Sequence, residues 1–237
     1  MTKKWQISLV AIFLLAEICF TMLSQILTGQ TLEIVEYVSI SLCLALALIF
    51  VTRNRFNCII CVGLAFTLCA DACLVLCKPI QQAYGMVFFS LAQLTYAVYL
   101  MIGFSKKTNL IMWIVRLLGS YATLIVTSVV LKDNFDFLSA ISMFYIFNLA
   151  FNLILAYVHF KKYGLLALGF TFFIFCDILI GLGSANGVYI TIASQTIRDL
   201  VASNIAWAFY IPSQTLIALT ATFSKLQRKP RLFEIKK

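Results

Sequence analysis

The stretches GLAFTLCADACLVL (63–76) and GFTFFIFCDILIGL (169–182) carry glycine, phenylalanine, aspartate and a final leucine at the same positions. In each, the aspartate is the ninth residue of Gly-x-x-Phe-x-x-x-x-Asp, so Asp71 and Asp177 stand in matching places within apolar sequence. An ionisable group in lipid is costly unless it faces the protein interior or a watered cavity. The two aspartates are therefore candidate functional residues, and the repeat indicates the architecture.

The composition is typical of an integral membrane protein, since hydrophobic residues make up 62% of the 237 and charged residues 11%. Apolar runs of roughly 18 to 25 residues are long enough to cross about 30 Å of hydrocarbon as helices. They predict an all-α fold, a polytopic membrane helical bundle of about eight transmembrane helices. We expect these near residues 6–28, 33–51, 58–78, 81–104, 110–131, 135–158, 165–183 and 198–223.

The repeat predicts two halves of four helices. One aspartate stretch falls in the third expected helix and the other in the seventh, and each half ends in Phe-Ser-Lys, at 104–106 and 223–225. Because four helices return the chain to its starting side, the halves run parallel, related by an axis along the membrane normal. We expect one membrane domain over 1–224, with pseudo-repeats of about 6–107 and 110–226, and a basic tail at 225–237.

This symmetry places the two aspartates at one depth, roughly 10 Å from the same ends of their helices. If the third and seventh helices meet near the axis, Asp71 and Asp177 share one pocket.

Charge predicts the orientation. Fourteen of the seventeen Lys and Arg residues near span ends fall on one side, and such residues are retained in the cytoplasm. We therefore expect a multi-pass protein of a bacterial cell membrane with both termini cytoplasmic. The net charge of +9 then reflects topology and attraction to anionic lipid headgroups, not nucleic-acid binding. Arg116, inside the fifth expected helix, is predicted to extend toward the inner surface.

Metal and cofactor sites are not expected. Most of the eight cysteines lie within spans, where a thiol behaves as a small apolar group. Cys58 and Cys61 have zinc-like spacing, but no second pair completes the set and His159 is the only histidine.

Further polar residues cluster on the helices that follow each aspartate. Gln93 and Tyr96 are three apart on the fourth helix and so share a face. The eighth helix carries a similar row, Asn204, Trp207, Tyr210 and Gln214. Glu17, in the middle of the first helix, is a candidate third acid. Asn148 and Asn152, four apart on the sixth, are attributed to helix packing.

Together these residues resemble the YhhN-like family of eight-span membrane proteins, whose characterised animal members are lysoplasmalogenases. The resemblance covers nearly the whole chain and rests on the two aspartate stretches, on SLAQLTYAVYL (90–100) and on AWAFYIPSQTLIAL (206–219). The recurring polar positions of that family correspond to Asp71, Asp177, Tyr96, Tyr210 and Gln214. The chain departs from the family at Ala70, usually glycine, and at Gln93, usually histidine.

The resemblance implies a hydrolase that cleaves the vinyl ether of lysoplasmalogens to a fatty aldehyde and a glycerophospholipid. Asp71 and Asp177 would act as general acid and base, one protonated and one ionised, as in glycoside hydrolysis. Gln93, Tyr96, Asn204, Trp207, Tyr210, Gln214 and Glu17 would bind or orient the substrate. The partner would be a lysophospholipid or another amphiphilic lipid within the membrane, and no cofactor is needed.

Two other functions fit the same residues. Parallel repeats and acids within the membrane also describe a proton-coupled small-molecule carrier, although the polar residues of the sequence thin out toward the cytoplasmic half. A non-catalytic lipid-binding homologue is the third alternative.

Overall fold

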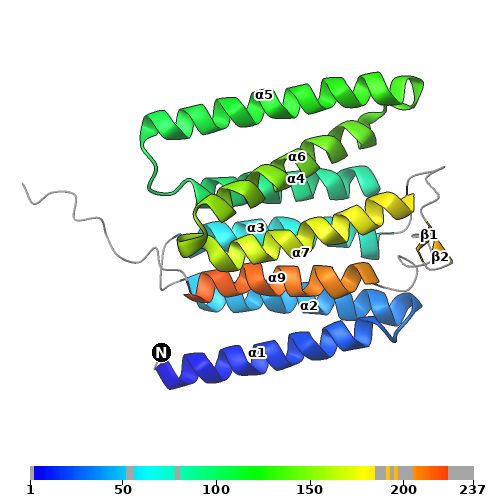
Figure 1. The fold of residues 1–237 in the computed structure, drawn as a ribbon. Helices are drawn as coiled ribbons and strands as arrows, with labels where there is room; N and C mark the ends of the chain where they lie inside the picture. Colours follow the sequence, from blue (N-terminus) through cyan, green and yellow to red (C-terminus); the bar gives the residue numbers. More distant parts are fainter. Residues whose placement is uncertain are drawn as a thin grey trace, which may run out of the picture.

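The computed structural model describes residues 3–51, 56–77, 81–184, 191–192, 195–196 and 205–223. Within these ranges eight long helices lie side by side and alternate in direction (Figure 1). They are α1 (Lys3–Ser24), α2 (Gly29–Ile49), α3 (Asn57–Asp71), α4 (Gln82–Leu100), α5 (Lys106–Leu131), α6 (Phe137–Val158), α7 (Phe160–Ser184) and α9 (Ile205–Phe223). The all-α helical bundle predicted from the sequence is confirmed.

Short elements complete the described chain. A π-helical turn (Ala72–Leu76) continues α3, and a 3-10 turn (Lys132–Asn134) follows α5. Two-residue strands, β1 (Thr191–Ile192) and β2 (Gln195–Thr196), pair antiparallel between α7 and α9. We call the end of the bundle with these strands the hairpin end, and the opposite end, where α1 begins and α9 ends, the termini end (Figure 1).

Length and composition suit most of the helices to a membrane. Seven of those in the described ranges are long and apolar enough to cross one. The eighth, α9, carries Ser213 and Gln214 at its centre, and both are fully buried. On the peripheral helices, Ile12, Leu117 and Val130 are 66%, 69% and 71% exposed, as expected for side chains that face lipid tails.

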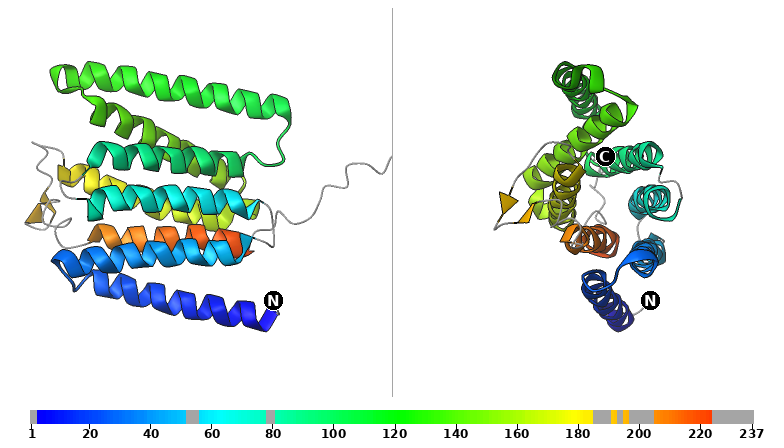
Figure 2. Two further views of the ribbon diagram at one scale, coloured as in Figure 1. Left: turned by 180° about the vertical axis from the view of Figure 1, so that it is seen from behind. Right: turned by 90° about the vertical axis from the view of Figure 1, so that its right-hand side faces the viewer.

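The two halves repeat the same contacts. In the first half α2 packs on α3 and α3 on α4, and in the second α6 packs on α7 and α7 on α9. Between the halves, α4 packs on α6 and α9 on α2, so the fourth helix of each half covers the second helix of the other. Seen from the end, α2, α3 and α4 face α6, α7 and α9, with α1 and α5 outermost (Figure 2).

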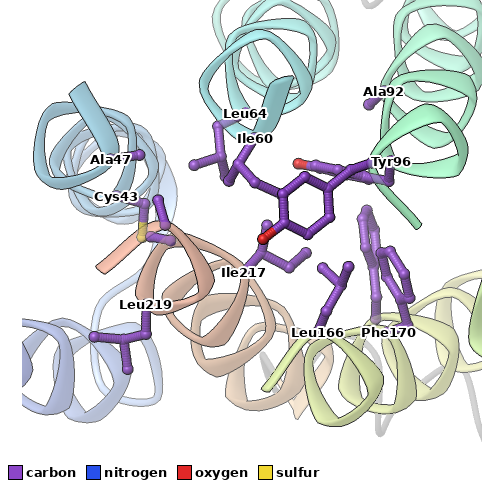
Figure 3. Close-up of a cluster of buried hydrophobic side chains, with 14 of the residues drawn as sticks. Cys43, Ala47, Ile60, Leu64, Ala92, Tyr96, Leu166, Phe170, Ile217 and Leu219 are labelled. Atoms are coloured by element: carbon purple, nitrogen blue, oxygen red, sulfur yellow. The ribbon is translucent and has the colours of Figure 1, made fainter. Parts of the chain in front are cut away.

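The repeated glycines are contact points in this arrangement. A Cβ on Gly63 would lie 2.2 Å from the Tyr96 ring of α4, and one on Gly169 would lie 3.2 Å from the Ser213 backbone oxygen of α9. Each glycine thus lets the third helix of its half approach the fourth. The core between them includes Ile60, Leu64, Tyr96, Leu166, Phe170 and Ile217 (Figure 3).

The predicted helix ends hold to within a few residues except at α7 and α9. We expected the seventh helix from 165, but α7 begins at Phe160 and bends at Tyr163, where φ is −120° and ψ is 24°. Hydropathy excluded its first turn because Lys161 and Lys162 are charged, yet those residues are helical. The eighth was expected from 198, and residues 197–204 lie outside the described ranges.

Candidate active site

Asp71 is the last residue of α3 and is buried, with 4% of its surface exposed. The Tyr210 hydroxyl of α9 donates to both of its carboxyl oxygens, at 2.7 and 2.8 Å. The π-helical turn begins at the next residue, and such turns are frequent at functional sites. The contact joins the third helix of one half to the fourth helix of the other.

Asp177 lies on α7 and is half-buried. The Tyr145 hydroxyl of α6 donates to its Oδ2 at 2.5 Å. Each aspartate of the repeat is therefore held by one tyrosine, but the two tyrosines are not equivalent by symmetry. Tyr210 comes from the half opposite to that of Asp71, whereas α6 and α7 belong to the same half.

Aromatic rings connect the two tyrosines. The Phe173 ring lies 5.4 Å from that of Tyr210 and 6.2 Å from that of Tyr145, and the Phe89 ring lies 6.5 and 5.6 Å from the same two. Trp207 extends the cluster, 5.5 Å from Tyr210. We call these five residues the aromatic cluster. Each carboxyl is therefore hydrogen-bonded to one tyrosine of this cluster, and the closeness of the two carboxyls and their shared pocket stay predictions.

Their depth agrees with the sequence argument. Asp71 is five residues from the end of the π turn and Asp177 seven from the end of α7, or roughly 7 to 10 Å from the hairpin end at 1.5 Å per residue.

Gln93 and Tyr96 are both fully buried but point to different helices. Gln93 Oε1 accepts from Asn152 Nδ2 on α6 at 3.0 Å. Tyr96 packs on Gly63, and its ring lies 5.6 Å from that of Phe170 at an interplanar angle of 54°. Gly63 precedes Asp71 by eight residues, about 12 Å along the helix, so the Tyr96 ring packs well below the level of Asp71.

Arg116 corrects one expectation, because it does not extend to the surface. It is 2% exposed, between α5 and α6. Its guanidinium donates to Asn148 Oδ1 at 2.8 Å and to Asn152 Oδ1 at 2.7 Å, and lies 4.6 Å above the Phe151 ring. Two amide oxygens and an aromatic face solvate the charge in place, so Asn148 and Asn152 do more than pack helices. Their side chains bind the buried guanidinium of Arg116.

The remaining predicted residues are spread along the bundle. Gln214 is buried and donates to Ser213 Oγ at 3.2 Å, while its Oε1 has no partner among the described residues. Glu17 lies between α1 and α2, accepting from Ser39 Oγ at 2.5 Å and from Cys43 Sγ at 3.7 Å. Asn204 lies outside the described residues.

Sequence reasoning missed Tyr145 and the two phenylalanines of the aromatic cluster. A tyrosine or phenylalanine inside an apolar helix does not stand out. A usable signal was the spacing of Tyr145, Asn148 and Asn152 at i, i+3 and i+7, which puts three polar side chains on one face of α6.

Surface hollows occur at both ends of the described bundle. One of about 410 Å³, lined by Gln30, Glu33, Ile34 and Leu76, opens beside the start of α2 at the hairpin end. Another of about 610 Å³ lies at the termini end, lined by residues that include Lys161, Lys162 and Thr220. In the part of the chain that the structure describes, no group of three or more His, Cys, Asp or Glu residues could hold a metal ion.

Comparison with known proteins gives one match. No curated protein and no solved structure matches the chain. The YhhN family matches over residues 32–221, from α2 almost to the end of α9, and this span contains both aspartates and both tyrosines that hold them. The chain belongs to the YhhN family.

Proposed function

We propose that the chain is an integral membrane hydrolase that cleaves the vinyl ether bond of lysoplasmalogens, with Asp71 and Asp177 as its acid and base. The observation that carries this proposal is the pair of carboxyls, each hydrogen-bonded to a tyrosine of one aromatic cluster. Membership in the YhhN family, whose members are lysoplasmalogenase-like, supports the substrate class.

The chemistry begins with a proton transfer from one carboxyl to the alkenyl carbon. The π electrons of the double bond form the new C–H bond, and the neighbouring carbon and the ether oxygen share the positive charge. The second carboxyl, ionised, stabilises this oxocarbenium ion. Aromatic faces also attract cations, and Phe89 and Phe173 lie between the two tyrosines that hold the carboxyls.

Water then adds to the cationic carbon and gives a proton to the second carboxyl. The hemiacetal hydroxyl returns a proton to the first carboxyl as the C–O bond to glycerol breaks. The glycerol oxygen takes the proton held by the second carboxyl. Both groups regain their starting states, and the products are a fatty aldehyde and a glycerophospholipid.

The replacement of a family histidine by Gln93 does not weigh against this reaction. Gln93 is hydrogen-bonded to Asn152, which lies seven residues after Tyr145 on α6, or roughly 10 Å along the helix. The site's position also suits the substrate, since carboxyls roughly 10 Å from a helix end are within reach of a lysolipid whose single chain stays in the bilayer.

The test is release of fatty aldehyde from a defined lysoplasmalogen by the purified protein in lipid nanodiscs. We expect turnover by the wild type and none from the saturated ether analogue, which has no double bond to protonate. Equal release from both would contradict vinyl ether chemistry.

A proton-coupled carrier is the second candidate, and one observation favours it. The polar face of α6 continues from Tyr145 through Asn148 and Asn152 to Arg116 and Gln93, so polar groups extend deeper than the sequence suggested. Proton-coupled solute uptake into proteoliposomes, lost in Asp71→Asn, with no turnover of any lysoplasmalogen would support this function instead.

The membrane orientation is part of the proposal. We place the termini end in the cytoplasm of a bacterial cell, because Lys106, Lys161 and Lys162 lie at that end together with the start of α1.

A further inference from the structure

Glu36 is a third acid near the site that the sequence did not single out. It lies on α2 and is 3% exposed, and its Oε1 has no hydrogen-bond partner among the described residues. It is seven residues from the start of α2, roughly 10 Å from the hairpin end, which is the depth of the two aspartates.

Glu36 faces Asp71. α2 packs on α3 and on the π turn that follows Asp71, and the two carboxyls are within electrostatic range of each other. The pseudo-symmetry gives a second argument. In the second half, the second helix provides Tyr145, its ninth residue, to the aspartate of the third helix. In the first half, the second helix carries Glu36 as its eighth residue, within electrostatic range of Asp71.

The surroundings of the two carboxyls differ in hydrogen bonding. Tyr210 donates to both oxygens of Asp71, and donors of this kind favour a carboxylate. Glu36 Oε1 is buried without a donor among the described residues, and an unpaired charge in such a place is costly. When two buried carboxyls lie within electrostatic range, the charge of one disfavours ionisation of the other.

We propose that Glu36 is a positioning residue that shares one proton with Asp71, holding it at rest and supplying it to Asp71 for transfer to substrate. This inference rests on the proposed function for its role, and it assigns the acid of the reaction to the Asp71 side. Asp177, with Tyr145, is then the carboxylate that stabilises the cation.

Several titratable groups lie within electrostatic range of this pair. Cys176 on α7 interacts with both carboxyls, and Asp71 also interacts with Tyr37 and Cys43 on α2, Tyr96 on α4 and Tyr145 on α6. On α2 itself Glu33 lies one turn toward the hairpin end, and α9 presents Tyr210. The π turn carries Cys73. On α1, Glu17 is deeper, bound to Ser39 and Cys43.

Infrared spectroscopy of the protein in nanodiscs at neutral pH tests, without substrate, whether Glu36 carries the proton. We expect a carbonyl band of protonated carboxyl in the wild type that shifts when glutamate is labelled with carbon-13. Glu36→Gln should remove part of that band, whereas Glu33→Gln on the same helix should not. An unchanged band in folded Glu36→Gln would overturn the proposal, as would a wild-type band that is insensitive to the glutamate label.

Activity supplies the second measurement. Aldehyde release should require the protonated acid and should therefore decline as the pH rises. In Glu36→Gln this decline should occur at a pH about one unit lower than in the wild type, because the coupling between two interacting carboxyls is of that order. Glu36→Asp, which restores a carboxyl, should return the profile toward that of the wild type. An unshifted profile in Glu36→Gln contradicts the role. If the wild type turns over no lysoplasmalogen, the proposed function fails, while the infrared result still decides whether Glu36 holds the proton.

Discussion

Replacing Tyr210 with phenylalanine tests the site by removing one oxygen atom and little else. The ring keeps its contacts with Phe89, Phe173 and Trp207, which lie 5.4 to 6.5 Å away between centroids. Only the hydroxyl that donates to Asp71 is lost. The change therefore separates hydrogen bonding at the carboxyl from packing of the aromatic cluster.

The size of the effect follows from the bond. One hydroxyl proton serves both oxygens of Asp71, so the loss amounts to one bond to a charged acceptor, roughly 1.5 to 3 kcal/mol. Since each 1.36 kcal/mol in a barrier is a factor of ten in rate, we expect kcat/KM for aldehyde release to fall about ten- to hundredfold.

The matched control is Tyr163→Phe. Tyr163 is also buried, and its hydroxyl donates to the Leu100 backbone oxygen at 3.0 Å near the termini end. Both variants lose one buried hydroxyl, so both should unfold at a somewhat lower temperature, but only Tyr210→Phe should lose activity. Wild-type rates in Tyr210→Phe, or an equal loss in Tyr163→Phe, would refute the link between this hydroxyl and the reaction.

Four other perturbations have definite expected outcomes. Asp71→Asn and Asp177→Asn should each abolish aldehyde release in folded protein, because an amide neither supplies the proton nor carries the charge. Gly63→Ala should lower the free energy of unfolding by about 1 to 3 kcal/mol through overpacking against a ring on α4, whereas Gly181→Ala, with open space at its Cβ, should not. Asp136 caps α6 and accepts two hydrogen bonds from its first turn, which hold its pKa below the ordinary value of 3.8. Its stabilisation is therefore present above that pH and lost below it, and the difference in melting temperature between the wild type and Asp136→Ala should shrink on acidification. A reporter that works only in the cytoplasm should be active when it is fused to the C-terminus. Activity of a periplasmic reporter at the same position would show that the predicted orientation is reversed.

The sequence predicted the helices well because lipid imposes a simple rule on it. An apolar run long enough to span the bilayer must be helical, since its backbone polar groups find no water. That rule predicted the positions of α1 to α6 to within a few residues. It says nothing about the π turn after Asp71, which arises from i to i+5 backbone bonds such as that from Cys77 to Ala72. Side-chain composition does not encode such a turn.

The candidate site was predicted only in part. Sequence identifies residues whose burial in lipid is unfavourable better than it identifies the side chains that contact them. Asp71 and Asp177 stand out because a carboxyl is rare in an apolar run. Tyr145 does not, because its ring suits the same run. Tyr96 shows the converse case, since this polar residue was singled out on the helix that follows Asp71, and its ring packs on Gly63. The direction of a side chain depends on helix rotation, which the neighbouring helices determine.

The two halves have kept their helix contacts while their polar partners have diverged, and this difference bears on mechanism. A strictly symmetric protein would hold Asp71 and Asp177 in identical surroundings, and the two carboxyls would then ionise alike. Here Tyr210 reaches Asp71 from the opposite half, whereas Tyr145 reaches Asp177 from its own half. Glu36 is the eighth residue of the second helix in its half and lies within electrostatic range of Asp71, whereas the other half has Tyr145 as the ninth residue of its second helix. The proposed hydrolysis of a vinyl ether needs one acid and one base, and we expect this difference in surroundings to assign those two roles to aspartates that the repeat makes equivalent in position.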